Sequence, residues 1–328
     1  MNAPFIQIPG GLRAVIFLMR ADLKHLHDDL DLPSHNSLEP CALCPCNSAD
    51  MPWWNLTKTA RWVTKTWKHA EWRVKFPLHH PIFEVVSIEC ICMDIMHILH
   101  LGITMYLLGS VLWVLTQEVL GGSAKANMET IWQDILSEYD VQGATTRYSS
   151  IKLSMFVVKP SVKLKGKAQE IKCLVPILRA VWDKRCDDTV VHHRLISRAL
   201  MLMHMIDNTL DESRGMFTLP DDLKRRYQSY IWAYLETQNA IAVKYQAHRP
   251  KVFNVTYKSH ALVHSSQQER ASSNHLWNVN AQFNVVLMRR EGFVKSVWFR
   301  LRFAPRIHFF VVGLAGASRH AVPLLHSI

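Results

Sequence analysis

Residues 94–122 read DIMHILHLGITMYLLGSVLWVLTQEVLGG, and this stretch decides the class of fold. An acidic residue opens it, positions 98–116 carry no charge, and two glycines end it. Glycine just past an apolar run is a common end of a helix. We therefore expect one helix over residues 94–120. The uncharged run is also about as long as a bilayer is thick, so a membrane protein with one span at 98–116 is the alternative to our preferred buried core helix.

The rest of the chain adds further helices and a few strands. Helical patterns over residues 127–139, 194–211 and 221–246 fill the middle third, whereas short apolar runs at 14–19 and 85–92 predict strands. An apolar run at 307–317 is too short to cross a membrane. The sequence therefore predicts a mixed α/β fold that is predominantly helical, followed by a weakly determined tail over residues 306–328.

Composition limits the function classes. The chain has 328 residues, 49% of them hydrophobic and 20% charged, which excludes disorder of the whole chain. A formal net charge of +11 favours nucleic acid or an anionic membrane surface as a partner. Seven cysteines, five of them in two tight groups, do not form the framework of a secreted disulfide protein. We expect a nuclear or cytoplasmic protein that is not secreted.

A cysteine motif predicts a metal site. Cys41, Cys44 and Cys46 follow the spacing C-x-x-C-x-C, and two cysteines separated by two residues can grip one zinc ion. Zinc needs four ligands, so this pair is half of a site. Cys46 can complete it, as can a histidine from a set comprising His35, His79, His80, His97 and His100. The alternative is three ordinary thiols in a proline-rich loop.

Two further motifs carry histidines at helical spacing. Asp94 and His97 share one face at the start of the expected helix, which suits a metal or phosphate site. A capping acid followed by a partly buried histidine is the alternative. His260 and His264 lie one turn apart, which is also the spacing of metal ligands, although a solvated or core helix face is the favoured explanation.

Residues 51–80 combine five tryptophans with six basic residues and one acid. Lysine and arginine can contact phosphates while tryptophan stacks on bases. The alternative is an amphipathic helix with tryptophan in the core. The basic candidates for DNA binding are Lys58, Arg61, Lys65, Lys68 and Arg73, together with Lys258, Arg289 and Arg290 in the basic stretch 248–308.

Several common catalytic motifs are absent from the sequence. There is no G-x-x-x-x-G-K-[ST] loop, no G-x-S-x-G nucleophile elbow and no H-E-x-x-H motif. ATP-driven and zinc-peptidase chemistry therefore have no support, and no small-molecule substrate is evident.

The order of the motifs is more specific than any one of them. An apolar strand ends at Asp22 and is followed by CALC at 41–44, HPIF at 80–83, DIMH at 94–97, KSHALVH at 258–264 and REGFV at 290–294. This order resembles the transposases of CACTA (En/Spm) type DNA elements. The resemblance covers roughly residues 13–116 and 245–299, and it implies an RNase H-like catalytic domain interrupted by a helical insertion.

The resemblance implies metal-dependent cleavage and transfer of DNA strands. Acidic residues would hold Mg²⁺ or Mn²⁺ ions that activate the attacking oxygen and stabilise the leaving one. Carried over by position, the catalytic residues are Asp22, Asp94, His97 and Glu291. The candidate metal-ligating residues are Cys41, Cys44, Cys46 and His97. DNA is the implied partner, and a homo-oligomer is compatible with this family.

The chain departs from the family pattern at its start. The first catalytic acid of the family lies well upstream of its C-x-x-C motif, whereas the 21 residues before Asp22 contain no acid. We therefore expect a truncated or decayed copy that binds DNA and does not catalyse transposition as it stands. The alternatives are a zinc-stabilised interaction module without a nucleic-acid role, the membrane protein described above, and a chain without a stable fold.

The expected organisation has four parts. Residues 1–100 form a partial RNase H-like core with the cysteine-rich loop, and residues 101–247 form the helical insertion. Residues 248–305 return to the core as a basic segment, and residues 306–328 form the tail.

Overall fold

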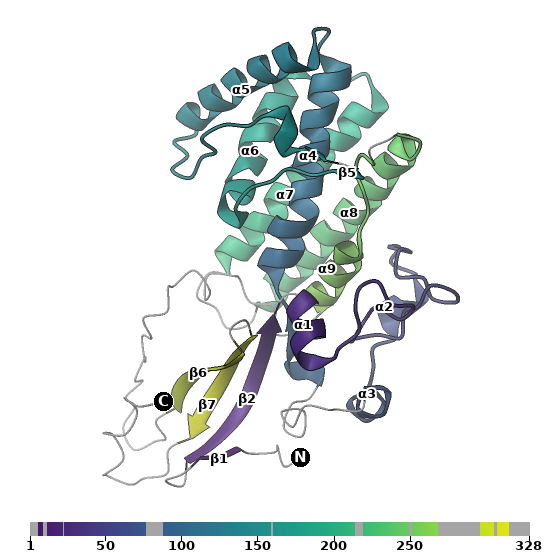
Figure 1. The fold of residues 1–328 in the computed structure, drawn as a ribbon, viewed down its shortest axis with the longest axis vertical. Helices are drawn as coiled ribbons and strands as arrows, with labels where there is room; N and C mark the ends of the chain where they lie inside the picture. The colour runs from purple at the N-terminus through teal and green to yellow at the C-terminus, as the bar shows by residue number, and fades with distance from the viewer. Residues whose placement is uncertain are drawn as a thin grey trace. The chain divides into compact units, whose positions relative to one another are not determined.

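Figure 1 shows the fold in a computed structural model of the chain. The structure describes residues 6–8, 12–21, 23–76, 88–158, 160–213, 219–248, 251–267, 296–304 and 307–314. Two compact units are present. The helical unit comprises Cys46–Thr64 and Asp94–Leu276, and the sheet unit comprises Met1–Pro45, Lys65–Met93 and Trp277–Ile328. The described part is mostly helical, as the sequence predicts.

A continuous helical segment runs through the helical unit. It consists of the π-helix η3 (Met96–Thr104), the α-helix α4 (Met105–Val114) and the π-helix η4 (Leu115–Val119). The predicted helix over 94–120 is therefore confirmed. Asn127 contributes to its end, because its side-chain amide donates to the carbonyls of Thr116, Leu120 and Gly122. The two glycines predicted as the stop thus lie beside an asparagine that satisfies the last carbonyl groups.

This segment is long and apolar enough to cross a membrane. Met96–Val119 has a mean hydropathy of 1.9 in its most apolar window, and 78% of that window is buried inside the protein. Burial against other helices is what a core helix shows, whereas the outer surface of an isolated span would face lipid. The structure therefore supports the preferred prediction of a core helix.

Further helices surround this segment (Figure 1). They are α5 (Ala124–Val141), α6 (Ala168–Arg185), α7 (Val191–Glu212), α8 (Asp221–Tyr245) and α9 (Tyr257–Gln267), with the short helix α2 (Arg61–Thr64). Helix α7 packs on α6 and α8, and α9 packs on α8 and η3. A single-turn helix η5 (Leu153–Met155) and the small hairpin β4 (Val157–Val158) and β5 (Ser161–Val162) lie between α5 and α6 in the sequence.

The sheet unit contains a mixed sheet. Its strands are β1 (Ile6–Ile8), β2 (Leu12–Ala21), β3 (Ile91–Met93), β6 (Ser296–Ala304) and β7 (Ile307–Leu314). The order is β1-β2-β7-β6 with antiparallel pairing, and β3 pairs with β2 in parallel. Helices α1 (Leu23–Leu30) and α3 (His69–Lys75) and the turn η2 (Ile88–Cys90) complete the unit.

The element predictions are mostly confirmed, with three differences. The apolar run 14–19 lies within β2, whereas among the described residues of the predicted strand 85–92 only Ile91 and Cys92 belong to a strand, β3. The predicted tail contains β7, which pairs with β2 along most of its length. The helical unit comprises Cys46–Thr64 and a long segment that starts at Asp94 and includes α9, whereas the predicted insertion covers residues 101–247; the predicted division into domains stays a prediction. The RNase H-like core stays a prediction.

Candidate metal centre and nucleic-acid interface

The cysteine loop is built to present sulfur atoms. Cys41, Cys44 and Cys46 are all buried. The backbone N–H of Leu43 donates to Cys41 Sγ at 3.3 Å, and the Leu43 carbonyl accepts from the backbone N–H of Trp67 at 3.0 Å. A tight turn with a backbone N–H on the first sulfur is the conformation that lets both cysteines of a C-x-x-C pair face one ion.

Helix α9 presents two histidines on one face. His260 and His264 are buried, and their Nε2 atoms lie 3.1 Å apart. The ring of Trp62 lies against both, at 4.0 Å from His260 and 5.7 Å from His264 between ring centroids. Tyr257 stacks on the other side of His260 at 5.2 Å. Aromatic packing thus fixes the two imidazoles on the helix.

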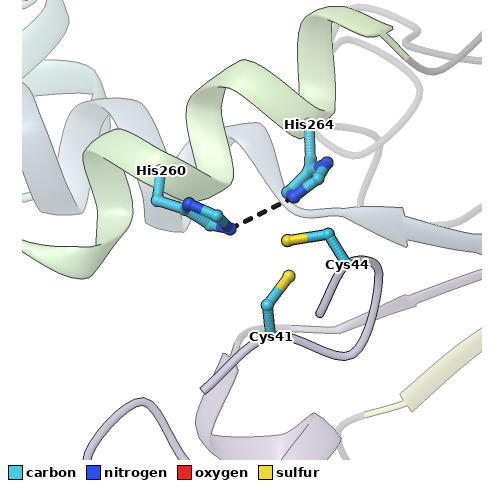
Figure 2. Close-up of side chains that lie close together, drawn as sticks. All are labelled: Cys41, Cys44, His260 and His264. Carbon is cyan, nitrogen blue, oxygen red and sulfur yellow. Dashed lines mark hydrogen bonds between the residues drawn. The ribbon is translucent and has the colours of Figure 1, made fainter. Parts of the chain in front are cut away.

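The cysteine pair and the histidine pair form one cluster. The candidate ligand atoms of Cys41, Cys44, His260 and His264 all lie within 4.8 Å of one another. In Figure 2 the two sulfur atoms point toward the two imidazole rings. Two nitrogen ligands at tetrahedral angles around zinc would be about 3.3 Å apart, from Zn–N bonds of about 2.0–2.1 Å. The observed 3.1 Å between the Nε2 atoms fits that spacing.

The donor set indicates the kind of metal. Two thiolates and two imidazoles are soft or borderline ligands, which suit zinc and do not suit magnesium or manganese. The Cys41, Cys44, His260 and His264 cluster can therefore bind a metal such as zinc. Within the described residues it is also the only group of three or more such side chains close enough to hold an ion. The expected Mg²⁺ or Mn²⁺ has no support there.

The sequence named both halves of this cluster without joining them. Cys46 was expected among the ligands and lies just outside the group, with its Sγ 3.7 Å from His260 Nε2. His97 was expected to ligate as well and instead bonds to Asp94. His35 is exposed, and His100 bonds to Asp207 in the protein core. His79 and His80 lie outside the described residues.

Asp94 and His97, predicted to share one helix face, are hydrogen-bonded to each other. The Nδ1 of His97 donates to Asp94 Oδ2 at 2.7 Å, and Asp94 Oδ1 accepts from the backbone N–H of Met96 at 2.9 Å. Asp94 thus has the hydrogen bonding of a helix cap, which was the alternative interpretation. Asp22 and Glu291, the other predicted catalytic acids, lie outside the described residues, so their convergence with Asp94 stays a prediction.

Lys258 has a structural role that its charge did not indicate. Its Nζ donates to the carbonyls of His97 and Leu101, at 2.7 and 2.9 Å. Leu101 departs from helical geometry, with φ −83° and ψ 19°, which frees carbonyl groups in the wide turns of η3. Gly102 leaves room for the lysine, because a Cβ there would lie 2.5 Å from Lys258 Cδ. Lys258 therefore fastens α9 to η3, and its predicted contact with DNA stays a prediction.

The remaining described basic candidates are available to a partner. Their side chains are exposed, and in the described part of the chain none of them forms an ion pair; they are Lys58, Arg61, Lys65, Lys68 and Arg73. The neighbouring Lys75, by contrast, pairs with Glu39. Arg289 and Arg290 lie outside the described residues.

The tryptophans of this region divide into two kinds. Trp62 and Trp72 are 0% exposed, so the core interpretation is correct for both. Trp54 is 49% exposed, and Trp53 and Trp67 are partly buried. The base-stacking interpretation is thus left with Trp54 as its best-placed side chain.

Comparisons with known proteins give no match to a family model, to a curated protein or to a solved structure.

Proposed function

We propose that this chain is a transposon-derived DNA-binding protein, related to the CACTA-type transposases, whose cysteine loop and α9 are held together by a structural zinc ion. The observation that carries the proposal is the cluster of Cys41, Cys44, His260 and His264. These residues belong to two separate motifs of the resemblance, CALC and KSHALVH. Motifs far apart in the sequence that converge on one metal-binding geometry support a common origin better than either motif alone.

The proposed zinc is structural. Four protein ligands fill a tetrahedral zinc site, so no position remains for a water molecule to be activated. When bound, the ion would supply a cross-link between ligands. Trp62 and Tyr257 pack on His260 and orient its ring. Burial of all four ligand residues excludes competing water from the site. The chain's own residues therefore provide a closed centre suited to holding segments in place.

DNA binding would come from charge. The net charge of +11 and the exposed side chains of Lys58, Arg61 and Lys65 offer contacts to phosphates. No acidic residue occurs between positions 51 and 70, so nothing in that segment opposes an approaching phosphate backbone. Binding of this kind releases counterions and weakens steeply with salt. We propose that the protein acts in the nucleus or cytoplasm and lacks transposase turnover as it stands.

The test is a salt titration of DNA affinity. The zinc-loaded full chain is titrated into a labelled mixed-sequence duplex, and anisotropy is measured between about 50 and 200 mM salt. We expect a steep linear fall of log K with log salt. The triple variant Lys58→Gln, Arg61→Gln and Lys65→Gln should reduce the slope by about 0.9 for each lost phosphate contact.

A matched triple variant removes the same charge elsewhere. Lys125, Lys152 and Arg225 are also exposed, and their replacement by glutamine should lower the slope less. Equal effects of the two triple variants would show that only net charge matters, and affinity independent of salt would overturn the electrostatic proposal.

The second candidate function is a zinc-stabilised interaction module without a nucleic-acid role. The same cluster favours it, because a closed zinc site is common in such modules. Stoichiometric zinc together with no duplex binding at low salt would select this candidate. Magnesium-dependent nuclease turnover that is lost in Asp22→Ala would instead overturn the proposed lack of catalysis.

A further inference from the structure

We infer that Trp54 is a stacking platform for an unpaired nucleobase, so that this chain prefers DNA with a single-stranded segment or an overhanging end. The inference rests on the proposed DNA binding and adds the form of DNA recognised. Both faces of a paired base inside a duplex are covered by its neighbours, so an indole ring stacks most readily where a base is unpaired. Stacking of bases on aromatic side chains tolerates any sequence because every base has a π-face.

The platform is formed by a tight turn. The backbone N–H of Asn55 donates to the Pro52 carbonyl at 3.1 Å, which places Trp53 and Trp54 at the two central positions of the turn. Trp54 is 49% exposed, although a large apolar ring is costly to leave in water. Trp53 packs edge-on against Trp54, with 5.6 Å between ring centroids and 87° between planes. The exposed ring is therefore supported from behind by a second indole.

Two routes anchor this turn to α9. Trp53 also packs on Tyr257 at 5.8 Å, and Tyr257 stacks on His260. Independently, Trp62 donates its indole N–H to the Asn55 carbonyl at 2.9 Å and lies 4.0 Å from the His260 ring. A ring held this way loses little conformational freedom on binding, which lowers the cost of association.

Charge around the platform matches a nucleic acid strand. Lys58 follows the turn by three residues, and Arg61 begins α2; both are exposed. Cations a few residues from an exposed aromatic ring are the arrangement of single-strand binding surfaces, in which bases stack and phosphates pair with lysine or arginine. Other exposed apolar side chains, such as Val243 on α8, offer no aromatic ring on which a base could stack.

The experiment compares three probes of one sequence: a single strand, a blunt duplex and a duplex with a single-stranded overhang. The zinc-loaded full chain should bind the single strand and the overhang more tightly than the blunt duplex at equal salt. Trp54→Ala should weaken those two about 5- to 100-fold, as loss of one stacked base predicts. Blunt-duplex affinity should change less than about twofold, since phosphate contacts dominate it.

Two further variants make the result specific. Trp54→Phe keeps an aromatic face and should retain most of the preference, whereas Val243→Ala should change no probe's affinity. The fluorescence of the wild type minus that of Trp54→Phe gives the contribution of Trp54 among the eleven tryptophans of the chain. Single-stranded DNA should quench this difference signal. Melting temperatures of all variants should match, because the Trp54 ring is half exposed.

The outcomes separate the two proposals. Salt-dependent duplex binding with unchanged single-strand affinity in Trp54→Ala overturns the platform and leaves the proposed function intact. An equal loss on all probes also overturns it. Absence of binding to any probe refutes the proposed DNA binding and the platform together.

Discussion

Loss of one zinc ligand is the sharpest perturbation that the structure offers. Cys44→Ser replaces a thiolate by a hydroxyl in a cluster whose four ligand atoms lie within 4.8 Å of one another. Free zinc at about 1,000 times its dissociation constant stabilises a folded protein by about 4.1 kcal/mol. For a unit of about 200 residues, each kcal/mol corresponds to about 2–4 °C. The wild type should therefore melt about 8–16 °C lower after chelation, and the variant should show almost none of this shift.

The assay combines metal content with thermal unfolding. Purified wild-type chain should hold one zinc per molecule after dialysis, and cobalt substitution should give the spectrum of a tetrahedral site with sulfur and nitrogen ligands. Cys173→Ser is the matched control, because this thiol lies on α6 and is not a member of the cluster. Wild-type protein that binds no zinc, or a chelator shift in Cys44→Ser equal to that of the control, would refute the reasoning.

Three further predictions concern the helical unit. Gly109→Ala should destabilise the protein by about 1–3 kcal/mol, since its Cβ would lie 2.6 Å from the Leu164 backbone nitrogen, whereas Gly121→Ala, with open space around it, should be nearly neutral in denaturant unfolding. Asp207→Leu removes the carboxylate that lies 2.8 Å from the buried His100 and should cost about 1–3 kcal/mol by the same measurement, more than Asp207→Asn, because a buried hydrogen-bonding group loses its partner. The hydrogen bond from Lys184 lowers the pKa of the Glu138 carboxyl, so the stability that Glu138 contributes is present above its unfolded pKa and is lost as pH falls through the lower folded pKa. The difference in unfolding free energy between the wild type and Glu138→Gln should therefore shrink on acidification, and a difference that does not change with pH would contradict this.

The helices could be predicted because their sequence signals are local. An apolar period and clear ends mark α5, α7 and α8, and the structure places each within a few residues of its predicted range. Helix α6 was not predicted, and Pro176 lies inside it, where proline removes a backbone hydrogen bond and weakens the helical pattern.

The sheet could not be predicted to the same degree. Strand β7 pairs with β2 across most of the length of the chain, and such pairing leaves no local trace in the sequence. Its apolar run 307–317 was judged only by whether it could span a membrane. Strand register depends on partners that are distant in sequence, so an isolated run of apolar residues does not reveal whether it is a tail or an inner strand.

The candidate metal site shows the same limit at the level of side chains. Each pair of ligands has a recognisable spacing, C-x-x-C in one motif and H-x-x-x-H in the other. The sequence could not show that the two motifs meet in the fold. Cys46 of the cysteine loop and His260 of α9, for example, lie 3.7 Å apart although 214 positions separate them in the sequence. Lys258 shows the converse, since a charged residue among basic neighbours proved to bind backbone carbonyls inside the helical unit.

The candidate zinc centre and the Asp94–His97 pair differ in the chemistry that they could support. A zinc centre with four protein ligands leaves no coordination position for a reacting water, so hydrolysis of DNA would need oxygen ligands elsewhere. Asp94 is the described candidate, and both of its carboxylate oxygens already accept hydrogen bonds, one from the Met96 backbone and one from His97. A carboxylate used in this way orders the start of η3, and a single carboxylate cannot hold the two ions that strand transfer by this class of mechanism uses. The described residues thus contain no complete two-metal site, and whether the chain could cleave DNA depends on Asp22 and Glu291.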